Sequence, residues 1–116
     1  PGEPTETPPP PPAPCPDANT RITSPGMNAA VSGWVSINGT ANHAQFQFYK
    51  VDYAIGDNPA TWNTIGDVRG SAVVGGQLAS IDTRGLPNGP AWFRLTVVDQ
   101  TGNFPPPCSV RVIISN

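Results

Sequence analysis

The sequence has few of the side chains on which enzymes depend. Only 12% of its 116 residues are charged, and it contains a single His and a single Lys. A catalytic Ser-His-Asp arrangement would have to use His43, which stands in the turn-like segment TANHAQ without a G-x-S-x-G motif. The only glutamates, Glu3 and Glu6, precede the body of the chain, and a chain this small has little room for a pocket that raises a carboxyl pKa. We therefore expect no enzyme and no cofactor.

Metal ligands are equally scarce. The two cysteines, Cys15 and Cys108, stand far apart, form no C-x-x-C motif and are accompanied by a single His, so no zinc site is expected. The segment from Asp99 to Asn103 (DQTGN) offers oxygen ligands, but calcium takes about six to eight of them. We interpret this segment as a hairpin turn, because Asp accepts backbone N–H bonds while Gly and Asn tolerate a positive φ.

Charge of neither sign is clustered. Six Lys and Arg side chains stand against eight Asp and Glu, and Glu3 and Glu6 account for the whole net charge of −2. Nucleic-acid binding needs clustered cations, and binding to a lipid surface needs a basic amphipathic stretch. No run approaches the roughly 18 apolar residues of a transmembrane helix. We expect no nucleic-acid partner and no membrane insertion.

Proline, in contrast, is abundant, and it divides the chain. Nine of the 16 prolines fall in the opening segment PGEPTETPPPPPAPCP. The longest run is Pro8, Pro9, Pro10, Pro11 and Pro12. Consecutive prolines exclude helix and central strand and favour extended polyproline II. We expect a proline-rich arm over residues 1–16, either a spacer or an arm that docks on a neighbour, and one domain over residues 17–116. Because the chain begins with proline and not methionine, we expect a mature or excised piece of a longer protein.

The body of the chain has the pattern of short strands. Val, Ile, Thr and aromatic residues alternate with polar ones, and Gly, Pro, Asn and Asp punctuate them. The expected strands are 20–24, 33–41, 46–55, 62–65, 73–74, 77–82, 91–99 and 109–115. The glycosylation sequon Asn38-Gly39-Thr40 is interpreted as a turn that ends a strand. About seven short strands in about a hundred residues predict an all-β, antiparallel β-sandwich.

The two cysteines have similar surroundings. Each is flanked by proline and lies just outside an apolar run, Cys15 near the start of the domain and Cys108 before the last strand. Because first and last strands are often neighbours in a β-sandwich, we expect a Cys15–Cys108 disulfide, with two free thiols as the alternative. The sequence leaves open whether the bond would lie within one chain or between two. A disulfide indicates an oxidising compartment, and hence an extracellular or cell-surface protein.

Three stretches resemble a known family. ITSPGMNAAVSGWVSINGTA, FYKVDYAIGDNPATWNTIG and LASIDTRGLPNGPAWFRLTVVDQTGN resemble the successive motifs of bacterial immunoglobulin-like (fibronectin-III-like) surface domains. The resemblance covers most of 20–115, although the family's tryptophan before Asp-Thr is Ile81 here and its tyrosine after the proline turn is Ala91. It implies an immunoglobulin-like sandwich that follows a proline-rich linker, and a non-catalytic spacer, adhesive unit or structural repeat.

Aromatic residues are the main functional signal. In an immunoglobulin-like sandwich the strands 46–55 and 91–99 are adjacent, so the outward residues of both would form one patch. The rings are Phe46, Phe48 and Trp92, and the rim consists of Lys50, Asp52 and Arg94. Trp34 faces outward on the other sheet. A free monomer seldom exposes so much aromatic surface. The alternative is that a β-bulge shifts the register, or that a loop or the arm covers the rings.

We expect this patch to bind another molecule. The first hypothesis is a structural or adhesive module of a bacterial surface protein, whose partner is protein and includes other copies of itself. An arm of one subunit lying on the rings of the next would give a head-to-tail filament. The alternative is a carbohydrate-binding module for cell-wall or extracellular polysaccharide, in which the rings stack on sugars.

Overall fold

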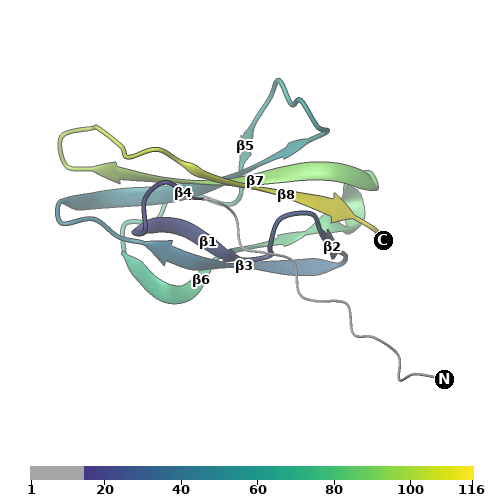
Figure 1. The fold of residues 1–116 in the computed structure, drawn as a ribbon, viewed down its shortest axis with the longest axis horizontal. Coiled ribbons are helices and arrows are strands. Elements are labelled where there is room, and N and C mark those ends of the chain that lie inside the picture. Colours follow the sequence, from purple (N-terminus) through teal and green to yellow (C-terminus); the bar gives the residue numbers. More distant parts are fainter. Residues whose placement is uncertain (1–14) are drawn as a thin grey trace.

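The chain folds into two facing β-sheets with almost no helix (Figure 1). The computed structural model describes residues 15–116, so the predicted arm up to residue 14, with Pro8 to Pro12, lies outside the described residues. The elements are β1 (Thr20–Ser24), β2 (Ala29–Val31), β3 (Trp34–Ala41), β4 (Phe46–Ile55), β5 (Asn63–Thr64), β6 (Val73–Asp82), the 3-10 helix η1 (Thr83–Gly85), β7 (Gly89–Asp99) and β8 (Cys108–Ile114). The all-β sandwich predicted from the sequence is confirmed. Among residues 15–116, no helix has the length and apolar character needed to cross a membrane.

The two sheets differ in size. One has three strands in the order β1-β3-β6, and the other has five in the order β2-β8-β7-β4-β5. All neighbours are antiparallel except β2 and β8, which run parallel. The sequence predicted that the strands 46–55 and 91–99 are adjacent. This is confirmed, because β4 pairs with β7 along most of its length.

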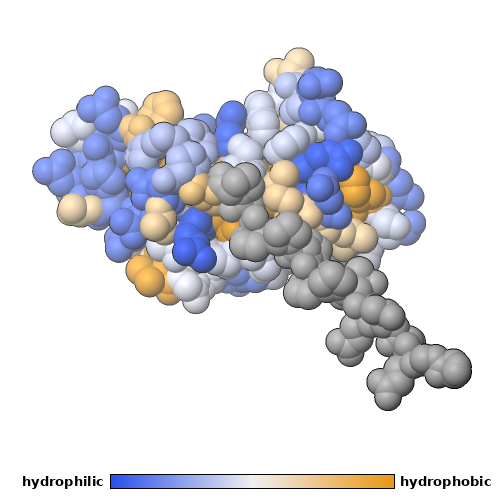
Figure 2. Space-filling model, viewed as in Figure 1, coloured by the Kyte–Doolittle hydropathy of each residue, from blue (hydrophilic) through white to orange (hydrophobic). Residues whose placement is uncertain are grey.

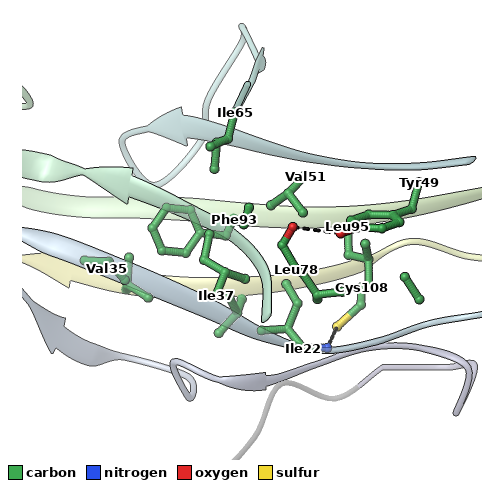
Figure 3. Packing of buried hydrophobic residues seen from close by; sticks show 14 of the residues in the cluster. Ile22, Val35, Ile37, Tyr49, Val51, Ile65, Leu78, Phe93, Leu95 and Cys108 are labelled. Atoms are coloured by element: carbon green, nitrogen blue, oxygen red, sulfur yellow. Dashed lines mark hydrogen bonds between the residues drawn. The ribbon is translucent and has the colours of Figure 1, made fainter. Parts of the chain in front are cut away.

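The core lies between the sheets, where alternate side chains of each strand meet (Figure 3). Phe93, Leu95 and Val97 of β7 are fully buried, and Figure 3 shows Phe93 beside Ile37 of the opposite sheet. Burial of each such side chain stabilises the fold by roughly 1.5–3 kcal/mol. The Tyr49 hydroxyl donates a hydrogen bond of 2.9 Å to the main-chain carbonyl of Leu78 in the other sheet. Burial also raises the pKa of that phenol above its usual value.

A disulfide joins Cys15 to Cys108, as predicted. Cys108 begins β8 and is buried in the core, with its Sγ 3.3 Å from the main-chain N of Ile22 in β1. The bond therefore links the segment before the three-stranded sheet to a central strand of the five-stranded sheet. In this structure the bond lies within one chain.

Two expectations about the strands were wrong in detail. The residues Val73 to Asp82 form one strand where two short ones were expected, because Gly75, at a φ of 62°, introduces an irregularity without ending the strand. The sequon at Asn38 is not a turn but lies inside β3, where register shifts relative to β6 surround it. Gly39 is needed there for space, because a Cβ would fall on the main-chain oxygen of Arg21 in β1.

Candidate binding surface on the five-stranded sheet

The outer face of β4 and β7 carries two parallel rows of side chains. The strands are in antiparallel register, so Phe48 lies opposite Val98, Lys50 opposite Thr96 and Asp52 opposite Arg94. These six side chains point away from the core because the residues between them, such as Tyr49 and Leu95, are buried inside it. The rows form a floor that is apolar at the Phe48 end and charged toward Arg94.

Two connections rise at the sides of this floor. The segment after β5 runs along β4, and Arg69 and Tyr49 exchange main-chain hydrogen bonds of 2.8 and 2.9 Å, which sets Val68 beside the floor. On the other side, the β7–β8 connection contributes Phe104 and Pro107. Val68 and Phe104 are more than half exposed, with 54% and 58% of their surface accessible.

Floor and walls border an open depression of about 640 Å³, which we call the trough. Its lining residues are Phe48, Lys50, Val68, Arg94, Thr96, Val98, Gly102, Phe104 and Pro107. The volume lies within the range of about 300–1,000 Å³ that is usual for binding pockets. Most of the lining is apolar, so the trough favours an occupant with an apolar surface.

Asp99 fixes the wall that carries Phe104. Its Oδ1 accepts hydrogen bonds from the main-chain N–H groups of Thr101 at 2.9 Å and Asn103 at 3.1 Å, and from the Thr101 hydroxyl at 2.5 Å. The bond from the Thr101 side chain is the main reason that the pKa of Asp99 is lowered from its usual value of 3.8. Gly102 follows at a φ of 86°. The predicted hairpin turn is thus confirmed. Within residues 15–116, no three His, Cys, Asp or Glu side chains gather as metal ligands would.

The charged end of the trough is built around a buried carboxylate. Asp52 is only 2% exposed, and it accepts a hydrogen bond of 2.7 Å from Thr64 of β5. Lys50 Nζ lies 3.7 Å and Arg94 NH2 lies 3.5 Å from its Oδ2. Two cations therefore face one anion, which leaves an excess of one positive charge at this end of the trough. The Arg94 guanidinium also lies over the Trp62 ring, 4.1 Å from its centroid, where a cation–π interaction holds it.

A second depression, of about 410 Å³, lies beyond Arg94 on the same face, and we call it the tryptophan cleft. Its lining residues are Asp57, Asn58, Pro59, Trp62, Trp92 and Ser109. Trp92 Nε1 donates a hydrogen bond of 3.2 Å to the main-chain oxygen of Asp57, and Arg111 Nε lies 2.6 Å from the Asp57 carboxylate. These bonds fix the β4–β5 connection, which rises above the sheet in Figure 1.

The residues selected from the sequence divide into two groups. Phe48, Lys50, Trp92 and Arg94 share the outer face of β4 and β7, as expected, although all four are half-buried rather than fully exposed.

Phe46 and Trp34 do not join them. The register shifts between Phe46 and Phe48, so alternation fails there and Phe46 packs against the core, with its ring centroid 6.4 Å from that of Tyr49. The expectation that Phe46 belongs to the exposed patch was therefore wrong, and a β-bulge is the reason. Trp34 is 66% exposed on the three-stranded sheet, and it lines neither depression.

The walls were not found from the sequence. Val68, Phe104 and Trp62 lie in connections or at the edge of a very short strand, where alternation gives no information about direction. The available signal was composition, since large apolar residues stand in segments that are otherwise rich in Gly, Asn and Pro. His43, the one candidate base, lies in the turn before β4 and is 4.0 Å from Asp99. Its Nδ1 accepts a hydrogen bond from the main chain of Gln45.

Comparison of the chain with protein-family models, with curated proteins and with solved structures finds no match.

Proposed function

We propose that the chain is a non-catalytic, extracellular structural or adhesive module that associates with other copies of itself through the outer face of its five-stranded sheet. The trough is the observation that carries this proposal. It is mostly apolar and open to solvent, and its volume is that of a usual binding site, so it suits an occupant with an apolar surface. The side of the molecule in Figure 2, in contrast, has only small, separate apolar areas among hydrophilic residues.

The fold and the disulfide support the extracellular setting. A three-stranded sheet facing one in which β8, β7 and β4 are neighbours agrees with an immunoglobulin-like arrangement, and we propose that the chain is a domain of this kind. The Cys15–Cys108 bond favours an oxidising compartment, because cytosolic thiols are usually kept reduced. We propose on this basis that the domain works at a bacterial cell surface or after secretion.

Sedimentation velocity of the full chain over a wide concentration range tests the proposal. We expect the weight-average sedimentation coefficient to rise with concentration in the wild type. Replacement of Val98 on the trough floor by Asp should hold the chain monomeric at the same concentrations, because it places a charge in an apolar contact. A wild-type chain that stays monomeric up to millimolar concentration contradicts the proposal.

The tryptophan cleft supports a second candidate function, the binding of polysaccharide. Trp62 and Trp92 provide aromatic surface beside the amide of Asn58 and the hydroxyl of Ser109, which can bond sugar hydroxyls. Replacement of Trp92 by Ala should then reduce co-sedimentation with insoluble cell-wall polysaccharide, while a Trp34→Ala control retains it. Equal retention of both variants on the polysaccharide argues against this function.

A further inference from the structure

We propose that the trough binds the proline run 8–12 of a second copy, so that successive chains join head to tail. This inference rests on the proposed function and deepens it, since it names the segment that the trough binds. Four features of the trough support it. They are a floor that offers no main-chain hydrogen bonds to a ligand, the dimensions of the trough, its charge and its position relative to Cys15.

The trough suits an occupant that needs no backbone hydrogen bonds. Its floor is the face of a sheet, where the main-chain groups of β4 and β7 lie in the plane of the sheet and bond to neighbouring strands, not upward into the trough. An ordinary peptide would bury N–H groups against Phe48, Val98 and Phe104 without acceptors, which is unfavourable. Proline has no N–H, and a polyproline segment is already extended and loses little entropy when it docks on aromatic rings.

The dimensions also match. Along β7, the floor extends over the four residue steps from Arg94 to Val98, which is about 13 Å. Five prolines in polyproline II span four steps of 3.1 Å, or about 12 Å. Across the floor, the walls stand on strands or segments that flank β4 and β7, about three strand spacings or 14 Å apart between backbones. Once the Val68 and Phe104 side chains are subtracted, this width admits one extended chain and not a helix of about 10 Å.

The charges of the two surfaces are complementary. Lys50 and Arg94 share the single carboxylate of Asp52, so the charged end of the trough has a local excess of one positive charge. The segment before the proline run carries Glu3 and Glu6 and no basic side chain. When the run lies on the floor, these carboxylates meet a cationic surface, and the association should weaken as salt concentration rises.

The disulfide favours the run of a second copy over the run of the same chain. The Cα atom of Cys15 lies 4.8 Å from that of Cys108, and Cys15 packs against the core, on the inner side of the sheet. Only two residues separate Cys15 from Pro12, so the Pro12 of the same chain stays within about 11 Å of Cys15. The run would therefore have to round β8 and cross the Pro107 wall before it reached the floor, and five prolines are too short to cross it and still lie along the floor. A second copy can enter along the open trough.

A complementation experiment with full-length chains tests this arrangement. One variant has the prolines 8–12 replaced by serine, and the other has Phe48→Ser in the trough. We expect each variant alone to be monomeric, with self-association weakened about ten- to a hundredfold. An equimolar mixture should form a one-to-one dimer and nothing larger, because one intact arm and one intact trough remain. The wild type should form longer species at the same total concentration.

Three controls keep the result interpretable. Phe104→Ser repeats the trough change at a loop residue that is 58% exposed, so it tests binding without a threat to folding. Trp34→Ser, on the other sheet, should leave association unchanged. A peptide of residues 1–14 should compete with wild-type association, and the same peptide with serine at 8–12 should not.

The outcomes separate the inference from the function on which it rests. If the wild type associates and the serine-arm variant associates equally well, the proline run is not the ligand, and this inference fails while the proposed function stands. If the mixture of variants gives no dimer although the wild type associates, the contact is not arm to trough, and the inference again fails. If the wild type remains monomeric, both fail.

Discussion

The outer faces of both sheets carry aromatic and aliphatic side chains, but the two faces offer different surfaces to a partner. On the three-stranded sheet, Trp34 and Val74 are 66% and 72% exposed, the largest values among the exposed large hydrophobic residues of 15–116. Yet they line neither the trough nor the tryptophan cleft. On the five-stranded sheet, Phe48 and Val98 are half-buried because Val68 and Phe104 stand on either side.

The difference shows that exposure by itself is a poor guide to a binding surface. An isolated exposed ring can bury only one side against a partner, whereas a ring on the floor of a trough offers a partner several contacts at once. Buried area sets the hydrophobic contribution, and shape sets how much area one partner can bury. The five-stranded face therefore carries the proposal although its individual residues are less exposed.

The largest expected effect tests whether the two faces belong to one cooperative unit. Replacement of Cys15 by Ser together with Cys108 by Ala opens the loop that the disulfide closes, and we expect a loss of about 4 kcal/mol in the free energy of unfolding. Urea unfolding followed by circular dichroism and by tryptophan fluorescence should shift equally with both probes. Reduced wild-type protein is the matched control. Two separate transitions would mean that the sheets unfold independently.

A smaller effect is expected when glycines near the two faces are replaced by alanine. Gly39→Ala in β3 brings a methyl group onto the main chain of Arg21, and main chain cannot move aside as a flexible side chain can. We expect the free energy of unfolding to fall by about 1–3 kcal/mol. Gly70→Ala, beside the trough wall, meets no atom within 4 Å and should change stability by about 0.5 kcal/mol or less. Chemical denaturation of both variants checks this. Equal losses would refute the close approach at Gly39.

A matched pair of identical substitutions compares the faces directly. Val98→Asp on the trough floor and Val74→Asp on β6 both add one carboxylate to an outer face. We expect Val98→Asp to weaken self-association by about tenfold or more, and Val74→Asp to leave it unchanged. Sedimentation at several concentrations measures both. The opposite ranking would assign the contact to the three-stranded face.

The sequence predicted the floor of the candidate site much better than its walls. Strict alternation placed Phe48, Lys50, Trp92 and Arg94 on one face, because hydrogen-bonded strands force successive side chains to opposite sides. The same rule failed at Phe46, where a bulge that has no clear sequence signature turns the ring toward the core.

The walls and one strand needed tertiary information. The short strand β2 was not predicted, because its three residues, Ala29–Val31, are held by parallel pairing to β8, which is distant in the sequence. Val68 and Phe104 lie in connections whose course depends on contacts such as the Tyr49–Arg69 pair. The disulfide, by contrast, was predictable, since two cysteines allow only one pairing within a chain.

The smallest expected effect concerns two aspartates, one at each face. The pKa of Asp82, across from Trp34, is lowered to about 2 chiefly by the Arg84 side chain, and that of Asp99, at the trough wall, is lowered chiefly by Thr101. Each ionised carboxylate therefore stabilises the fold above its ordinary pKa of 3.8, and the contribution disappears as pH falls through the lowered folded value. We expect Asp82→Asn and Asp99→Asn to be slightly less stable than the wild type at pH 7, and the difference to shrink steadily as the pH falls below 3.8. Urea unfolding from pH 7 to 2 measures this difference.

The same two variants also differ in their expected effect on association. At pH 7 only Asp99→Asn should weaken self-association, because only Asp99 holds the wall that carries Phe104. Equal weakening by Asp82→Asn would show that the trough is not the contact surface.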